Sequence, residues 1–306
     1  MMKKLIAILS AAALLAASAF SLDAQTLRKN KEFSPFENVE VCKAFVVTFE
    51  NSDSYEADWE INAELAEYVD IYVRQNTLKV DLNKEGAKLL KKNYRGQNLP
   101  VMKITISMPD ITNLTLTENS SIDVESEPMH SKNFTFTAKD KAKVTEFSMN
   151  VDGNAAINLS KDADVTLKMM AKKIKISADN SAVMALTHSS DEISVVQGGS
   201  SSIGLAGDVD KIEIETRNSS KLNIQGNGYQ LSCNSKGVSE IEAEKFEVKK
   251  ASVVLNSAIA WINATDELEM ELSNSSEVIF CGNPKMKIVD VKKSSITRIE
   301  NAEKKK

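Results

Sequence analysis

The sequence has few of the residue types on which catalytic and metal sites usually depend. It contains only three cysteines, Cys42, Cys233 and Cys281, and two histidines, His130 and His188, in 306 residues. The cysteines are too few for a disulfide scaffold and have no CxxC spacing, although one disulfide of unknown pairing stays open. We expect most of them to be small buried hydrophobic residues. Neither histidine has a second histidine or a cysteine at metal-ligand spacing, and we expect both to be exposed or in turns.

The chain also lacks the short motifs of common enzymes. There is no GxSxG nucleophile turn, no HExxH zinc motif and no phosphate-binding glycine loop. The sequence therefore predicts no catalytic residue, no metal and no cofactor. The net charge of −5 argues against a nucleic-acid partner, because such proteins usually present a basic face.

Only the N-terminus carries a long apolar run. Lys3 and Lys4 precede the run at 5–20, and the pattern predicts a secretory signal peptide over 1–24. Cleavage is expected after Ala24, with Ala19 as the alternative. The run is shorter than the ~20 residues that span a bilayer. We therefore expect an exported protein with no transmembrane segment after signal removal, in the periplasm, at the outer-membrane surface or outside the cell.

What the sequence does contain is a repeat. The string Asn-Ser-Ser stands at 119–121, 218–220 and 274–276, and equivalent positions recur from 119 to 293 in steps of 18 to 21 residues. A period near 19 that is sustained over ten units indicates a stack of similar structural units.

Two columns of the repeat have a clear composition. The first column consists mostly of residues that tolerate the positive φ of a sharp corner, namely Asn119, Asp140, Asn180, Gly199, Asn218, Gly237, Asn256 and Asn274. The second column, two residues further on, contains only small side chains, namely Ser121, Ala142, Ala163, Ala182, Ser201, Ser220, Ser239, Ala258, Ser276 and Ser295. We expect these columns to form crowded structural corners, with the Asn and Ser side chains hydrogen-bonded in ladders along the stack.

Alternating strands flank each corner, for example at 134–138, 174–178 and 212–216. A unit of 19 residues cannot bury its own apolar face, but stacked units can. The sequence therefore predicts an all-β fold, a right-handed parallel β-helix or β-solenoid with coils of about 19 residues over 117–300. A propeller would need blades of about 40–45 residues, and a β-sandwich would not keep a constant step.

The first third of the chain differs from the repeats. We expect 25–116 to be a β-rich capping section, continuous with the solenoid and containing antiparallel pairs, or alternatively a separate small domain. Within it, 39–50 should turn back on itself, and 62–82 should hold a short helix or extended turn before two strands. The basic stretch 83–100 is predicted to be a loop. We expect 301–306 to be a solvated basic tail.

The units at 212–222 (IEIETRNSSKL) and 268–278 (LEMELSNSSEV), together with the opening segment 36–82, resemble the head GIN domain family of putative auto-transporter adhesins. The resemblance covers nearly all of the chain after the signal peptide. It implies an exported β-helical protein of Gram-negative bacteria. It implies no enzymatic activity and therefore no catalytic residues.

The resulting hypothesis is an exported, non-catalytic β-solenoid that acts as an adhesin-like or envelope-associated binding module. Its partner would be a glycan, a lipid or an envelope protein. Trp59, Tyr229 and Trp261 are candidates for stacking on sugar rings, although we expect each to serve packing.

Two alternatives remain open. A polysaccharide-active β-helix enzyme would need at least three carboxylates converging on one groove, and acidic residues do recur at turns, at 191–192, 208–210 and 266–267. Asp is also common in turns for conformational reasons. The other alternative is a structural or lipid-binding periplasmic protein. The ligand and the oligomeric state are not predicted.

Overall fold

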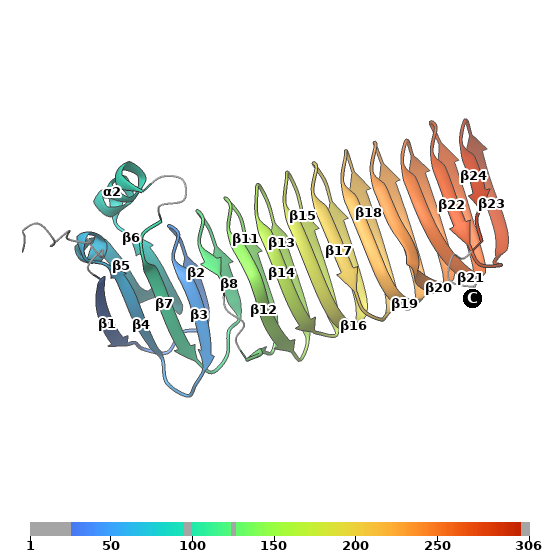
Figure 1. Ribbon diagram of the computed structural model, residues 1–306. Helices are drawn as coiled ribbons and strands as arrows, with labels where there is room; N and C mark the ends of the chain where they lie inside the picture. Colours follow the sequence, from blue (N-terminus) through green and yellow to red (C-terminus); the bar gives the residue numbers. More distant parts are fainter. Residues whose placement is uncertain (1–25, 95–98, 124–126, 301–306) are drawn as a thin grey trace, which may run out of the picture.

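The structure is a computed structural model that describes residues 26–94, 99–123 and 127–300. In these residues 24 strands form one continuous sheet, which winds into a solenoid of about 10 turns with about 19 residues per turn (Figure 1). The predicted stack of parallel coils is confirmed. The predicted signal peptide (1–24) and tail (301–306) lie outside the described residues.

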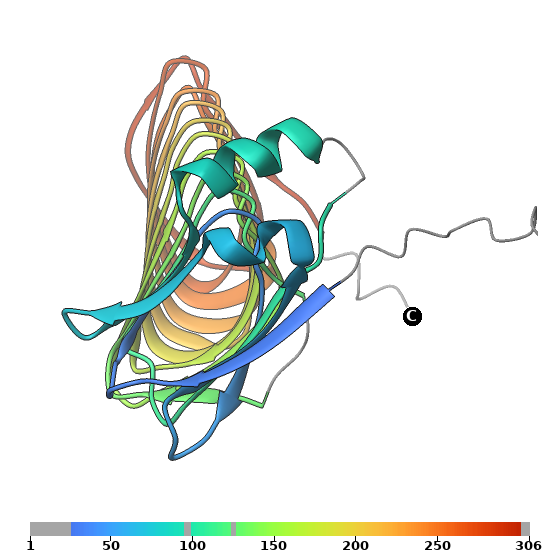
Figure 2. The same ribbon diagram turned by 90° about the vertical axis from the view of Figure 1, so that its left-hand side faces the viewer.

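Each coil is flattened into two layers that meet at a sharp corner on one side and a rounded base on the other (Figure 2). We call the strands that run toward the corner the first layer. They pair in parallel in the order β6 (Thr77–Leu82), β2 (Asn38–Val41), β8 (Asn113–Leu116), β11 (Phe134–Ala138), β13 (Asn154–Leu159), β15 (Lys173–Ala178), β16 (Val183–Gln197), β18 (Val209–Arg217), β19 (Lys221–Lys236), β20 (Glu240–Asn256), β21 (Ile259–Ser273) and β23 (Lys285–Lys292).

The strands that leave the corner form the second layer. The long strands β16, β19, β20 and β21 begin in this layer and continue round the base into the first. The other members of the second layer are β7 (Met102–Met108), β3 (Val46–Asn51), β9 (Ser121–Ile122), β12 (Lys143–Val151), β14 (Asp164–Met170), β17 (Ser202–Ala206), β22 (Glu277–Cys281) and β24 (Ser295–Arg298). β10 (Met129–Ser131) pairs with the end of β12.

The core lies between the two layers and consists of the alternate side chains that point inward. In β13 these are Ala155, Ile157 and Leu159, and each is covered by its register partner on the neighbouring coils, such as Ile176 beside Ile157. Each inward residue is buried by the equivalent residues of the neighbouring coils, which explains why the alternation of apolar and polar residues repeats along the whole sequence.

The corners require an unusual backbone conformation. Positive φ occurs at Asn119, Asp140, Lys161, Asn180, Gly199, Asn218, Gly237, Asn274 and Lys293. In one coil the expected position is wrong, because the positive φ lies at Ser257 and Asn256 is the last residue of β20. The cause is an extra residue in β20, where Asn223 pairs with Glu242 but Gln225 pairs with Lys245.

The small column next to each corner is buried. All its members are buried except Ser295, which lies on the last coil. The hydroxyls of Ser201, Ser220 and Ser276 donate to the carbonyl three residues earlier in their own corner, at 2.7, 3.1 and 2.6 Å. The predicted ladder of serine side chains is therefore wrong for these residues, since the carbonyl within the corner is the acceptor. One asparagine rung does form, from Asn274 Nδ2 to Asn256 Oδ1 at 3.1 Å.

The N-terminal section combines coils of the solenoid with antiparallel additions. β1 (Thr26–Glu32) pairs with β4 (Glu56–Asn62), β4 pairs with β7, and β5 (Val69–Arg74) pairs with β6, all antiparallel. The predicted short helix before two strands is confirmed as η1 (Ala63–Tyr68), β5 and β6. η1 and α2 (Lys84–Asn93) lie across this end of the solenoid (Figure 2). The division into two sections at residue 116 stays a prediction.

The loop predicted over 83–100 is wrong, because 84–93 form α2. Asn83 caps this helix, and its Oδ1 accepts hydrogen bonds from the backbone nitrogens of Glu85 and Gly86, both at 3.0 Å. Gly86 lets the helix approach η1 closely, because a Cβ there would lie 2.4 Å from Tyr68 Cβ. The lysines of this stretch belong to the exposed face of an amphipathic helix.

The segment 39–50 turns back on itself as predicted, but its two strands do not pair with each other. β2 and β3 are joined by Lys43 and Ala44, which have φ values of 60° and 61°. β2 pairs with β6 and β8, whereas β3 pairs with β7 and β9. The segment is therefore a further solenoid corner, built without asparagine or glycine.

Crowding at the corners predicts the effect of adding volume there. Ser239 is 1% exposed, and its Oγ lies 3.1 Å from Thr216 Oγ1 and 2.5 Å from Ser235 Oγ. We expect Ser239→Val to lower the free energy of unfolding by roughly 2 kcal/mol, because it overpacks the corner and removes the buried hydroxyl that bonds to Thr216 and Ser235. Urea denaturation measures this. Ser252→Val on the outer face of β20 is the control, and an equal loss in both variants would contradict the crowding.

Candidate functional site

A strip of small side chains, most of them polar, runs along the outer face of the first layer. These side chains alternate with the core residues and therefore point to solvent. From β11 to β20 we define this outer strip by its small or amide-bearing members, Thr135, Thr137, Ala156, Asn158, Ser177, Ser194, Val196, Ser232, Asn234, Ser252 and Val254. Because the coils are in register, their side chains lie in rows along the solenoid.

Three open hollows lie on the outer strip. One of 320 Å³ is lined near the corners by residues such as Asn158 and Val196. One of 340 Å³ shares Val196 with it and extends to Ser252. The third, of 250 Å³, shares Ser194 and Glu213 with the second. The hollows therefore adjoin one another and form an elongated depression over β13 to β20.

Charged side chains lie along the border of the outer strip and also within its rows, where Lys175, Glu213 and Glu215 stand in register with members of the strip. Lys173 lies 2.8 Å from Glu192, and the hydrogen bond between them lowers the pKa of Glu192. Lys211 lies 2.7 Å from Glu213, and Arg217 lies 3.8 Å from Glu215. Glu213 and Glu215 each have a basic partner, so beside these paired charges and Lys175 the strip offers hydroxyl and amide groups, which both donate and accept hydrogen bonds.

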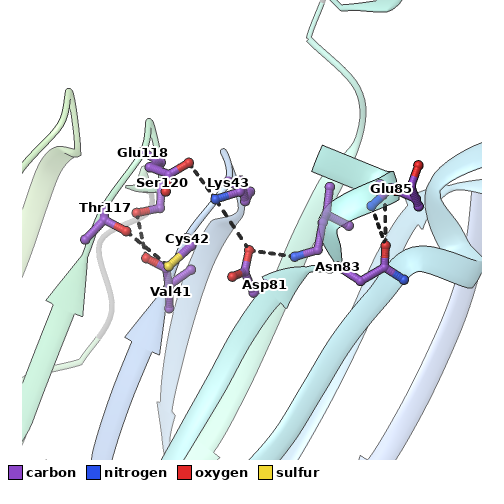
Figure 3. Close-up of polar contacts among 11 residues, drawn as sticks. Val41, Cys42, Lys43, Asp81, Asn83, Glu85, Thr117, Glu118 and Ser120 are labelled. Atoms are coloured by element: carbon purple, nitrogen blue, oxygen red, sulfur yellow. Dashed lines mark hydrogen bonds and ion pairs between the residues drawn. The ribbon is translucent and has the colours of Figure 1, made fainter. Parts of the chain in front are cut away.

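A polar cluster lies where the N-terminal section meets the first coils (Figure 3). Lys43 Nζ lies 2.5 Å from Glu118 Oε2 and 3.9 Å from Asp81 Oδ1. Next to it, Thr117 Oγ1 donates to Cys42 Sγ at 3.1 Å. The lysine thus joins the ends of β6, β2 and β8, which are neighbours in the first layer.

This cluster is suited to holding coils together rather than to nucleophilic chemistry. Burial raises the pKa of the Cys42 thiol, and the carboxylates of Asp81 and Glu40 raise it further. The thiol is therefore protonated at neutral pH and is a poor nucleophile. No sequence signal indicated this cluster, because its members come from three separate coils and the corner at Lys43 lacks the Asn-Ser-Ser pattern.

The two histidines differ from each other. His130 is exposed, as expected, but His188 is 7% exposed, so the expectation is wrong for it. His188 occupies an inward position of β16, in register with Met169. Its Nδ1 lies 3.2 Å from Ser190 Oγ, whereas Nε2 has no hydrogen-bond partner among the described residues. Burial lowers the pKa of His188 to about 4.

The carboxylates at the turns each contact a different partner and do not converge on one groove. Glu192 pairs with Lys173, and Glu267 with Lys250 at 3.2 Å. Asp208 Oδ1 accepts from the backbone and side-chain nitrogens of Asn227. Within the described residues no group of three histidine, cysteine, aspartate or glutamate side chains is placed to hold a metal ion.

The three aromatic candidates are not brought together. Trp59 is buried in the core on β4. Tyr229 is exposed on β19, with Lys249 Nζ 5.6 Å from its ring centroid. Trp261 is half-buried beside a hollow of 300 Å³, in an outward row between Glu242 and Ile279.

The three cysteines are free, and Cys233 and Cys281 are buried. Burial raises the pKa of Cys233 to about 12. No helix in the described part of the chain is long and apolar enough to cross a membrane.

The pKa of His188 predicts a pH dependence of stability. Its folded value of about 4 lies below the ordinary 6.5, so the unfolded chain binds more protons between these values. The free energy of unfolding should therefore fall as the pH falls from 6.5 to about 4, by up to about 1.4 kcal/mol per pH unit from this group. Urea denaturation across this range measures the slope. His188→Met should reduce it and His130→Met should not; an unchanged slope in His188→Met would contradict the assignment.

The family model described as "Putative auto-transporter adhesin, head GIN domain" matches residues 35–284. No curated protein matches the chain. Among solved structures it is similar to a putative lipid binding protein from Parabacteroides distasonis, with 17% identity over 90% of this chain and 98% of that chain and a TM-score of 0.44. It is also similar to a putative adhesin from Parabacteroides merdae, with 14% identity over 90% and 97% of the two chains and a TM-score of 0.43. On the family match, this chain belongs to the head GIN domain family of putative auto-transporter adhesins.

Proposed function

We propose that this chain is an exported, non-catalytic binding module of the cell envelope, and that its ligand is a neutral glycan chain held along the outer strip. Membership in an adhesin family supports a binding role. The observation that carries the proposal is the run of three adjoining hollows, whose lining combines hydroxyl and amide groups with carboxylates that already have basic partners.

The chemistry of the outer strip matches a neutral polymer rich in hydroxyl groups. Serine and threonine hydroxyls and the amides of Asn158 and Asn234 donate and accept, as sugar hydroxyls do. Coils about 4.8 Å apart repeat these groups at regular intervals. A ligand with its own regular repeat can therefore make the same contact on several coils. Each contact is weak, but the ligand gains affinity from the number of contacts. The groups are held on a paired sheet, so little conformational entropy is lost on binding.

The other ligand and activity classes fit the outer strip less well. An acyl chain is held best in an enclosed apolar cavity, whereas these hollows are open on the face of a sheet.

Hydrolysis of a glycan needs two carboxyl groups on opposite sides of the scissile bond. Glu213 and Glu215 do not meet this requirement, because they lie on one strand and are paired with Lys211 and Arg217. Release of shorter sugars from a bound glycan would favour the enzyme instead.

Blocking the centre of the outer strip tests the ligand site. Ser194 lines two of the hollows and is only half-buried, so Ser194→Trp should fill them without disturbing the core. We expect binding to a panel of neutral envelope and host-surface glycans, measured by calorimetry, to weaken at least about tenfold. Ala185→Trp is the matched control, because Ala185 points outward on the second-layer part of the same strand. Absence of glycan binding, or equal loss in both variants, would refute the site.

Export is tested by the N-terminus of the mature chain. The predicted signal peptide requires that protein recovered from the cell envelope or medium begins after Ala24, or after Ala19. Intact-mass measurement distinguishes these forms. Full-length protein confined to the cytoplasm would contradict export. Digestion by a protease added to intact cells, with permeabilised cells as the control, then separates a surface location from a periplasmic one.

A further inference from the structure

The last coil of the solenoid leaves its core side chains uncovered. Met286, Ile288 and Val291 of β23 are in register with Leu268, Met270 and Leu272 of β21. The β21 residues are 0 to 1% exposed, whereas their β23 partners are 41, 55 and 37% exposed. These β23 residues thus continue the inward rows of the solenoid, but no described coil lies over them. Residues 301–306, which lie outside the described structure, contain no apolar side chain larger than alanine.

The two ends of the solenoid differ in this respect. At the N-terminal end η1 and α2 lie across the first coils (Figures 1 and 2), and Leu65 and Gly86 of these helices are buried. At the other end β23 pairs only with β21, and β24 only with β22. Each of these edge strands therefore has one side of its backbone donors and acceptors free of strand pairing in the described structure, which is a template for another strand.

The order of inward and outward residues in β23 is the same in both directions. Outward Lys285 and inward Met286 begin the strand, and inward Val291 and outward Lys292 end it. The register with β21 shifts by one residue after Ile288, which inserts Val289 and restores the alternation around the strand centre. Without this shift the reversed strand would present outward residues opposite inward ones.

We propose that a second copy of this chain docks on the open end, with the two β23 strands antiparallel about a two-fold axis between Ile288 and Val289. In this register Met286 of one copy faces Val291 of the other, and Lys287 faces Asp290. Both pairs occur twice, so the dimer joins apolar rows to apolar rows. It also places Lys287, which contacts Glu269 of its own chain at 3.0 Å, opposite Asp290, which contacts Lys292 of its own chain. The two Lys285–Lys292 pairs at the strand ends oppose it, but they are exposed and therefore weak.

The same geometry disfavours a head-to-tail filament. Such a filament would place the apolar open end of one copy against the N-terminal end of the next, where η1 and α2 lie and where the described edge strand β1 carries mostly polar and charged side chains. A two-fold contact uses the same surface on both copies and closes after two chains. The outer strip lies along the side of the solenoid, so this inference does not rest on the proposed ligand.

The oligomeric state of the mature chain tests the inference. We expect sedimentation equilibrium of residues 25–306 to give dimers that dissociate on dilution. Ile288→Lys should abolish the dimer, because it places a charge in the contact. Ile288 is exposed in the single chain, so the fold should survive, as circular dichroism can verify. A monomer at all concentrations, or an unaffected dimer in Ile288→Lys, would overturn the proposal.

A charge exchange tests the register itself. Lys287→Asp and Asp290→Lys should each weaken dimerisation at least about tenfold, because each places like charges opposite one another. The double variant should restore the dimer, since each aspartate again faces a lysine. Lys139→Asp, on a distant coil, is the control and should leave the dimer unchanged. Failure of the double variant to recover would exclude this pairing.

Discussion

The structure depends on one constraint: no coil can bury its own apolar side chains, so each must be covered by the coils before and after it. Ile157 illustrates this, because it is fully buried and lies between Phe136 and Ile176 of the two neighbouring coils. Full burial of such a side chain contributes about 1.5–3 kcal/mol, and the stacking therefore supplies most of the stabilisation. It also imposes the register. A shift of one residue would turn an entire inward row toward solvent.

Stacking also constrains the backbone and the side chains at each corner. Successive corners stack directly on one another, so the corner residue must adopt positive φ and the buried residue that follows it in the small column must have a small side chain. Where the sequence supplies asparagine or glycine, the strain is small. At Lys43 neither is present, and the ion pairs of its side chain with Glu118 and Asp81 tie that corner to both neighbouring coils. The lysine at this corner thus stabilises the contact between the N-terminal section and the first coils.

The repeat could be predicted from sequence because the stacking constraint acts on every coil in the same way. The features that were missed are those where one coil differs from the others. The extra residue in β20 moved a corner from Asn256 to Ser257, and nothing in the local composition marks a bulge. The lysines of helix α2 give its sequence the composition of a basic loop and obscure Leu89 and Leu90, which pack against the core. The burial of His188 follows from strand alternation, but only once the second-layer part of β16 is known to extend as far as this residue. Polar contacts among separate coils, as at Lys43, have no signal in a single sequence.

Stacking fixes the inward rows and leaves the outward rows free, so specific recognition must come from positions that the core does not constrain. The sides of the solenoid provide many such positions with identical spacing, which suits a repetitive ligand. The end is different, because there the inward row itself meets solvent. Met286 and Ile288 would be buried in any inner coil, and covering them in a dimer would regain part of the 1.5–3 kcal/mol that each inner residue contributes. The same interaction that holds successive coils together therefore also makes the open end a surface for association.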